Sequence, residues 1–140
     1  MFYVSVALAV ISNVLYHVGQ RSVPRDLHPL ASLLVNYGVA MAGTLLLVPF
    51  VPSAKPLAGS FRDVNWASVA VGVSIVGVEL AILLAYRSGW NVGLLSITIG
   101  AALAVVLVPV GLTFFHERPS ATNLIGIVFC VVGLFLVTRK

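Results

Sequence analysis

Charged residues are scarce in this sequence. Asp, Glu, Lys and Arg make up 9% of its 140 residues, whereas an ordinary soluble domain contains about 25%. Hydrophobic residues make up 60%, so the folded chain has too few polar groups to cover its surface in water. The scarcity of charge argues against a soluble globular domain. It predicts a multi-pass protein of the cell membrane (plasma or inner), with the lipid bilayer as its solvent.

Acidic residues are the rarest of the charged types. There are four of them against eight Lys and Arg, a net charge of +4. All eight bases fall in the connections between apolar stretches or at their ends, which is typical of a membrane interface. They form no continuous basic face, so nucleic acid is not an expected partner.

Cysteine and metal-ligand clusters are also lacking. Cys130 is the single cysteine, which excludes an internal disulfide. The three histidines, His17, His28 and His116, are too scattered to suggest a zinc site. The sequence contains no nucleophile paired with a base and no glycine-rich phosphate loop. We therefore expect neither an enzyme nor a bound cofactor or metal.

Long apolar stretches dominate what remains. Each is about 18–24 residues long, enough to cross roughly 30 Å of hydrocarbon as a helix. The first has no basic region before it and no small-residue cleavage site after it, so we expect a retained helix. The sequence predicts an all-α membrane protein, a single domain over 1–140. Its five expected transmembrane helices cover residues 2–20, 29–51, 66–86, 92–115 and 121–138.

Five crossings place the two ends of the chain on opposite sides of the membrane. The N-terminal side receives three bases: Lys55, Arg62 and Arg118. The other side receives five: Arg21, Arg25, Arg87, Arg139 and Lys140. The positive-inside rule then favours a cytoplasmic C-terminus and an N-terminus outside. The difference is small, and it leaves insertion in both orientations open.

Glu79 stands in the middle of the third apolar stretch, "VSIVGVELAILLAY". An acid at this depth is costly and usually marks a functional site with a specific partner. The first stretch carries a polar stripe at helical spacing, formed by Asn13, Tyr16, His17 and Gln20. Asn13 and Glu79 lie at nearly equal depth, and His17 about one turn further on. We expect Asn13 or His17 to donate a hydrogen bond to the Glu79 carboxyl, in a substrate or proton-coupling site.

Further polar side chains are expected in the same half of the membrane. They predict a polar cavity near the midplane that opens toward the first interhelical connection, with Glu79 near its floor. The predicted lining residues are Tyr16, Gln20, Asn36, Tyr37, Tyr86, Ser96 and Thr98. A purely structural alternative stays open: Glu79 as a neutral acid making one interhelical hydrogen bond, and the stripe as polar contacts between helices.

The end of the chain resembles a known family. "FFHERPSATNLIGIVFCVVGLFLV" is similar to the end of an EamA repeat of the drug/metabolite transporter superfamily, which turns at a Glu-Arg or Glu-Lys pair and continues into a helix with two glycines. The matching residues here are Glu117, Arg118, Gly126 and Gly133. Two further stretches resemble parts of that repeat. Its second helix, which begins at a proline, is similar to "HPLASLLVNYG". The corner between its third and fourth helices is similar to "LAYRSGWNVGLLSITIG". The resemblance implies one five-helix repeat.

The sequence departs from that family in two ways. Full-length members contain two inverted repeats, whereas this chain has one. Relatives in the small multidrug resistance branch carry their proton-coupling glutamate in the first helix, where this chain has Asn13 and His17. Since alternating access uses two inverted halves, the resemblance implies a dimer of opposed copies or a heterodimer with a short paralogue. Gly126 and Gly133, two turns apart, are the predicted dimer seam, with packing inside the chain as the alternative.

The function implied by the resemblance is transport of a small molecule, a metabolite or drug, across the membrane, with proton coupling through Glu79 as a hypothesis. Two alternatives remain at this stage. One is a flippase subunit for a lipid-linked intermediate, which requires a lateral opening between helices. The other is a non-transporting subunit that assembles with a membrane partner. The sequence does not identify the substrate, the direction of transport or the coupling ion.

Overall fold

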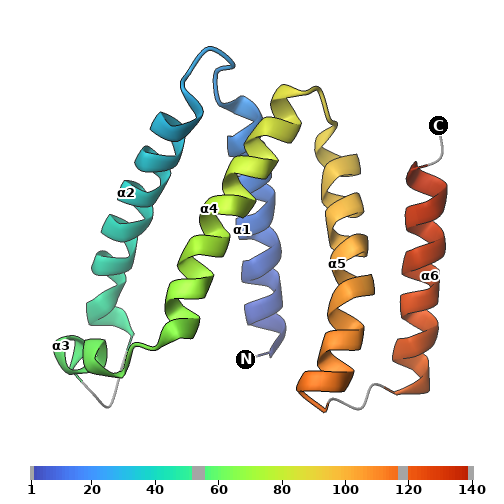
Figure 1. The fold of residues 1–140 in the computed structure, drawn as a ribbon. Helices are drawn as coiled ribbons and strands as arrows, with labels where there is room; N and C mark the ends of the chain where they lie inside the picture. The colour runs from blue at the N-terminus through green and yellow to red at the C-terminus, as the bar shows by residue number, and fades with distance from the viewer. Residues whose placement is uncertain (1, 52–55, 117–119, 139–140) are drawn as a thin grey trace. The chain divides into compact units, whose positions relative to one another are not determined.

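The computed structural model describes residues 2–51, 56–116 and 120–138, and within these ranges the chain is helical with no strand. The chain divides into two compact units, Met1–Ser88 and Gly89–Lys140. The first unit contains the helices that carry most of the predicted site. Figure 1 shows the order of the helices along the chain.

The first unit is built from three long helices: α1 (Phe2–Ser22), α2 (Pro29–Leu47) and α4 (Trp66–Arg87). Two of them begin at capping side chains. The His28 ring accepts a hydrogen bond from the Leu30 N–H at 3.3 Å, before Pro29 at the first helical position. The Asn65 side chain accepts one from the Ala67 N–H at 3.0 Å.

The connection from α2 to α4 is rich in Pro, Gly and Ser, which predicts a flexible loop over residues 51–65. The described part of this loop contains a four-residue helix, α3 (Leu57–Ser60), followed by the 3-10 turn η2 (Phe61–Asp63). Another 3-10 turn, η1 (Val48–Phe50), comes just before the loop. Helix α2 also ends earlier than the predicted residue 51, because the chain tightens into η1 at Pro49.

The second unit consists of two helices, α5 (Val92–Phe114) and α6 (Ala121–Thr138), which pack against each other. Gly89, with a φ of +97°, forms the turn that precedes α5. Ser120 caps α6 as its sequence position predicts, accepting a hydrogen bond from the Asn123 N–H at 3.2 Å. Glu117 and Arg118, the pair that carries the family resemblance at this turn, lie outside the described residues.

Among the described residues, four helices are long and apolar enough to span a membrane. They cover Tyr3–Ser22, Pro29–Phe50, Trp66–Arg87 and Val92–Phe114. The predicted fifth span is helical with its expected bounds, and the described stretch Thr122–Gly133 within it is apolar. The described chain is therefore all-α with helices long and apolar enough to span a membrane, and the fifth crossing stays a prediction.

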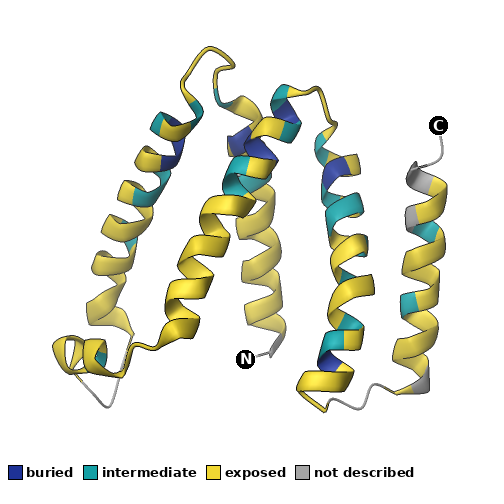
Figure 2. Cartoon of the chain, in the orientation of Figure 1, coloured by how far each residue is buried: buried dark blue, intermediate teal, exposed yellow. Residues whose placement is uncertain are grey.

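Packing in the first unit is concentrated at one end of the helices, near the α1–α2 connection (Figure 2). The buried residues there are Gln20, Ser32, Leu33, Ile82, Leu83 and Tyr86. Every described residue of α4 from Trp66 to Val78 is exposed. Both α1 and α2 contact α4, so α4 connects the other two long helices, and its buried residues lie at the packed end.

Candidate functional site

Glu79 is paired with a neighbouring helix. The Asn36 Nδ2 of α2 donates a hydrogen bond to the Glu79 Oε2 of α4 at 3.2 Å, and both side chains are partly buried. Glu79 is eight residues before Arg87, or about 12 Å along the helix, well inside the apolar span. An acid at this depth needs a specific polar partner to stabilise it, and here that partner is the Asn36 amide.

The donor to Glu79 differs from the one predicted. Asn13 is exposed, and its Nδ2 donates to the Ala9 carbonyl of its own helix at 3.2 Å. His17 turns instead to Tyr86, whose hydroxyl lies 2.7 Å from the His17 Nδ1. The expectation that Asn13 or His17 bonds Glu79 is corrected by these contacts. Equal depth in the membrane places two residues at one height, but it does not make them face each other.

A groove of about 560 Å³ runs past Glu79. Three of its polar lining residues come from α1 at four-residue intervals, which places Ser12, Tyr16 and Gln20 on one face of that helix. The residues that line the groove are Ser12, Leu15, Tyr16, Gly19, Gln20, Val23, Asn36, Val39, Ala40 and Glu79. Its volume falls within the range of small-molecule sites, roughly 300–1,000 Å³.

A second cavity, of about 290 Å³, lies between α1 and α4. It shares Tyr16 and Glu79 with the groove, and its other lining residues are Val71, Ser74, Ile75 and Val78. The Tyr16 and Glu79 side chains therefore separate two spaces. A ligand in either space reaches the same carboxylate and the same phenol.

The groove contains hydrogen-bonding groups that the described chain does not satisfy. Gln20 is 4% exposed. Its amide faces the Tyr16 hydroxyl one turn earlier, and neither group has a further hydrogen-bond partner among the described residues. A buried polar group without a partner costs about 1–3 kcal/mol. The groove thus presents an amide and a phenol that a ligand can satisfy.

Two further predicted lining residues of the first unit, Tyr37 and Tyr86, do not line this groove. The Tyr37 hydroxyl is buried and has no hydrogen-bond partner among described residues, but Tyr37 does not line either cavity. Tyr86 is 2% exposed and contacts His17 through its hydroxyl. Ser96 and Thr98 are on α5 in the second unit, where the Ser96 hydroxyl donates to the Val92 carbonyl at 3.0 Å. Their place beside Glu79 stays a prediction.

The predicted seam glycines are on α6. A methyl group built at Gly126 or Gly133 would meet no described atom within 4 Å. Close packing inside the chain therefore does not require either glycine. Their role in a dimer stays a prediction.

Two arginines join α4 to α1 and to the α1–α2 connection by hydrogen bonds. The Arg87 Nη2 donates to the carbonyls of Leu27 at 2.6 Å and Pro24 at 3.3 Å. The Arg21 Nη1 donates to the Tyr86 carbonyl at 2.9 Å. The sequence predicted that the cavity opens toward this connection. The groove extends to Val23 at this end, and the direction in which it opens stays a prediction. The bonds from these arginines to backbone carbonyls could not be predicted from their positions at helix ends.

Among the described residues, no group of three or more His, Cys, Asp and Glu could hold a metal ion. Comparison with protein-family profiles, with curated proteins and with solved structures gives no match for this chain. The function is therefore inferred from the residues that line the groove.

Proposed function

We propose that this protein is a membrane transporter for a small molecule and that it works as a dimer of opposed copies. The observation that carries the proposal is the Glu79–Asn36 pair in a groove that also holds the Tyr16 and Gln20 side chains. Ionisable residues inside membrane helices face helix interiors or water-filled paths and mark substrate or ion pathways.

The groove supports a binding role better than a structural one. A structural acid needs one hydrogen bond, and Asn36 supplies it. The same role gives no reason for a 560 Å³ space beside the acid, or for an amide and a phenol that have no described partner apart from each other. A ligand with hydrogen-bonding groups would satisfy them, which is what a transport site does in its loaded state.

The dimer is supported by how little of the groove the first unit encloses by itself. Its apolar walls are open, since Leu15 and Val39 are 72% and 68% exposed. The resemblance of the sequence to a single EamA repeat also favours a dimer, because alternating access requires two inverted halves and one repeat provides one of them. A second copy in the opposite orientation would close the groove and supply the missing half.

The exposed walls also favour a second candidate, a flippase subunit for a lipid-linked intermediate. An opening lined by Leu15 and Val39 would admit an acyl chain from the bilayer while a polar head reaches Glu79. The two candidates differ in what closes the groove in the working state. A second copy closes it in a carrier of soluble molecules, and lipid fills it in a flippase.

Transport by reconstituted protein tests the proposal. The full chain is placed in liposomes under an imposed pH gradient, and uptake is measured for radiolabelled metabolites and cationic dyes. We expect Glu79→Gln, which keeps volume and hydrogen bonding but removes the charge, to fold normally and abolish gradient-driven uptake. Asp63→Asn is the matched control, since it removes a carboxylate outside the long helices, and it should transport as the wild type does.

The outcomes separate the candidates. Uptake by Glu79→Gln with an unchanged pH profile would end the proton-coupling hypothesis. Translocation of a fluorescent lipid-linked sugar, without uptake of soluble compounds, would favour the flippase. If neither activity appears in wild-type liposomes although the protein is folded, the chain is an assembly subunit and the transport proposal fails.

A further inference from the structure

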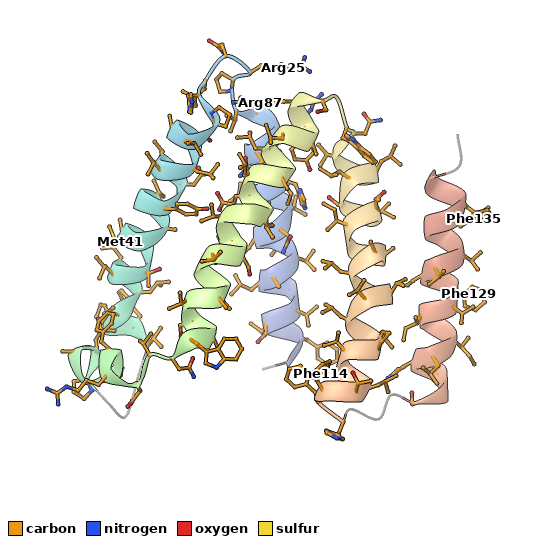
Figure 3. The ribbon with its side chains drawn as sticks, viewed as in Figure 1. Arg25, Met41, Arg87, Phe114, Phe129 and Phe135 are labelled. Atoms are coloured by element: carbon orange, nitrogen blue, oxygen red, sulfur yellow. The ribbon has the colours of Figure 1, made fainter. Side chains whose placement is uncertain are left out.

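Three arginines gather where α1 ends, where the chain turns toward α2, and where α4 ends. Arg21, Arg25 and Arg87 line one small cavity together with Gln20, Val23 and Tyr86. Figure 3 shows Arg25 and Arg87 at this end of the first unit. We call Arg21, Arg25, Arg87 and Gln20 the arginine cluster. It lies at the end of the membrane-spanning segments, the depth of the lipid headgroups.

Part of the cluster has a structural role. Arg21 and Arg87 each donate to backbone carbonyls, which joins the α1–α2 connection to α4. A guanidinium has five N–H donors, so these bonds leave others free to bind a ligand.

The cluster also holds donors without partners. The Arg87 Nε and the Gln20 Nε2 are both buried and have no hydrogen-bond partner among described residues. Arg25 is exposed and donates to none of the described residues. One acid, Asp26, is found in this connection, and its side chain is exposed. Buried unpaired donors beside three positive charges are a site for an anion.

We infer that the arginine cluster binds a phosphate group, as carried by an anionic lipid headgroup or free in solution. Arginine forks match phosphate oxygens in pairs. The cavity is small, about 10 Å³, which is room for about one water-sized group. A ligand would thus insert one oxygen toward Gln20 and the Arg87 Nε while its remaining oxygens meet Arg21 and Arg25.

Lipid binding to the purified full chain tests this inference. Native mass spectrometry in detergent follows dioleoylphosphatidylglycerol as it is added, with dioleoylglycerol as the lipid that lacks the phosphate. We expect Arg25→Gln to weaken phosphatidylglycerol binding about five-fold, the effect of losing one basic contact near an anionic headgroup. Arg62→Gln removes the same charge from the α2–α4 connection and should leave binding unchanged.

Gln20→Leu adds a test whose two readouts move in opposite directions. Without lipid, the variant should unfold at a higher temperature, because an unsatisfied buried amide is replaced by an apolar side chain. It should also bind phosphatidylglycerol less tightly, because a donor to the phosphate is lost. A higher unfolding temperature with unchanged binding would remove Gln20 from the site.

An excess of inorganic phosphate distinguishes the two sources of the ligand. Displacement of phosphatidylglycerol shows a site that accepts free phosphate, and retention shows one that requires the lipid. Either result supports the inference. Equal losses for Arg25→Gln and Arg62→Gln, or dioleoylglycerol bound as tightly as phosphatidylglycerol, would overturn it and leave the arginines as ordinary interface anchors. This test is independent of transport, so it stands or fails apart from the proposed function.

Discussion

Replacing Tyr86 with phenylalanine tests the contact that joins α1 to α4. The Tyr86 hydroxyl lies 2.7 Å from the His17 Nδ1, and the Tyr86 side chain is 2% exposed. Phenylalanine keeps the buried ring, so the change removes the hydroxyl and leaves a partly buried imidazole without this partner. Packing of the ring against α1 and α2 should be unchanged.

The expected loss follows from the kind of bond removed. Interhelical hydrogen bonds in membranes contribute about 0.6 kcal/mol on average and at most about 1.7. The short distance of this bond and the burial of the Tyr86 side chain place Tyr86→Phe in the upper half of that range, about 1–1.7 kcal/mol. Tyr86→Ala also removes the ring and should cost about 3–5 kcal/mol, as other buried aromatic truncations do.

Unfolding in mixed micelles, followed by circular dichroism as sodium dodecyl sulfate is added, measures these differences. Asn13→Ala is the control, since its amide is exposed and bonds its own helix; it should change stability by less than about 0.5 kcal/mol. A double-mutant cycle with His17→Leu isolates the pair. If Tyr86→Phe costs as much in the His17→Leu background as in the wild type, the bond does not stabilise the protein and the reasoning fails.

Three further predictions concern packing, the connection and the seam. Leu83→Ala should cost about 2–5 kcal/mol in the same assay because Leu83 is 1% exposed, whereas Leu84→Ala, at 45% exposure, should cost far less; equal losses would contradict the packing described. Arg87→Gln removes two bonds to backbone carbonyls of the α1–α2 connection, so limited proteolysis should cut there faster than in the wild type. Gly126→Leu with Gly133→Leu should keep the monomer stable, since neither position meets a neighbour within the described chain. The pair should reduce chemical crosslinking between copies, and unchanged crosslinking would show that the seam lies elsewhere.

The helices could be predicted from the sequence because length and apolarity decide them in a bilayer. Backbone groups must be satisfied inside each segment, so apolar stretches bounded by Pro, Gly and charged residues become helices with little help from neighbours. α4 and α6 begin where predicted, and the ends of α1 and α4 differ by two residues or fewer. The ordered turns around α3 were missed because a stretch rich in Pro, Gly and Ser is typical of loops.

For the partner of Glu79, the sequence could predict only the depth in the membrane. Depth follows from 1.5 Å per residue, but which side chains meet also depends on the rotation of each helix about its axis. Tyr16 and His17 are adjacent and point about 100° apart, so Tyr16 lines the groove while His17 meets Tyr86. Asn36 was expected to line the cavity, and it proves to be the donor that Asn13 and His17 were expected to be.

Gln20 lines both the groove and the arginine cluster, and this position explains why a buried amide is informative here. A leucine would fill the same space at the end of α1 without an unsatisfied donor and acceptor, so packing alone does not account for glutamine. The groove and the arginine cluster share Gln20, but a substitution that removes one charge can change either site without changing the other. Glu79→Gln changes the groove and leaves all three arginines in place, whereas Arg25→Gln changes the cluster and leaves the Glu79–Asn36 bond intact. Loss of uptake without loss of lipid binding in the first variant, and the reverse in the second, would show that the groove and the arginine cluster bind separate ligands on either side of Gln20.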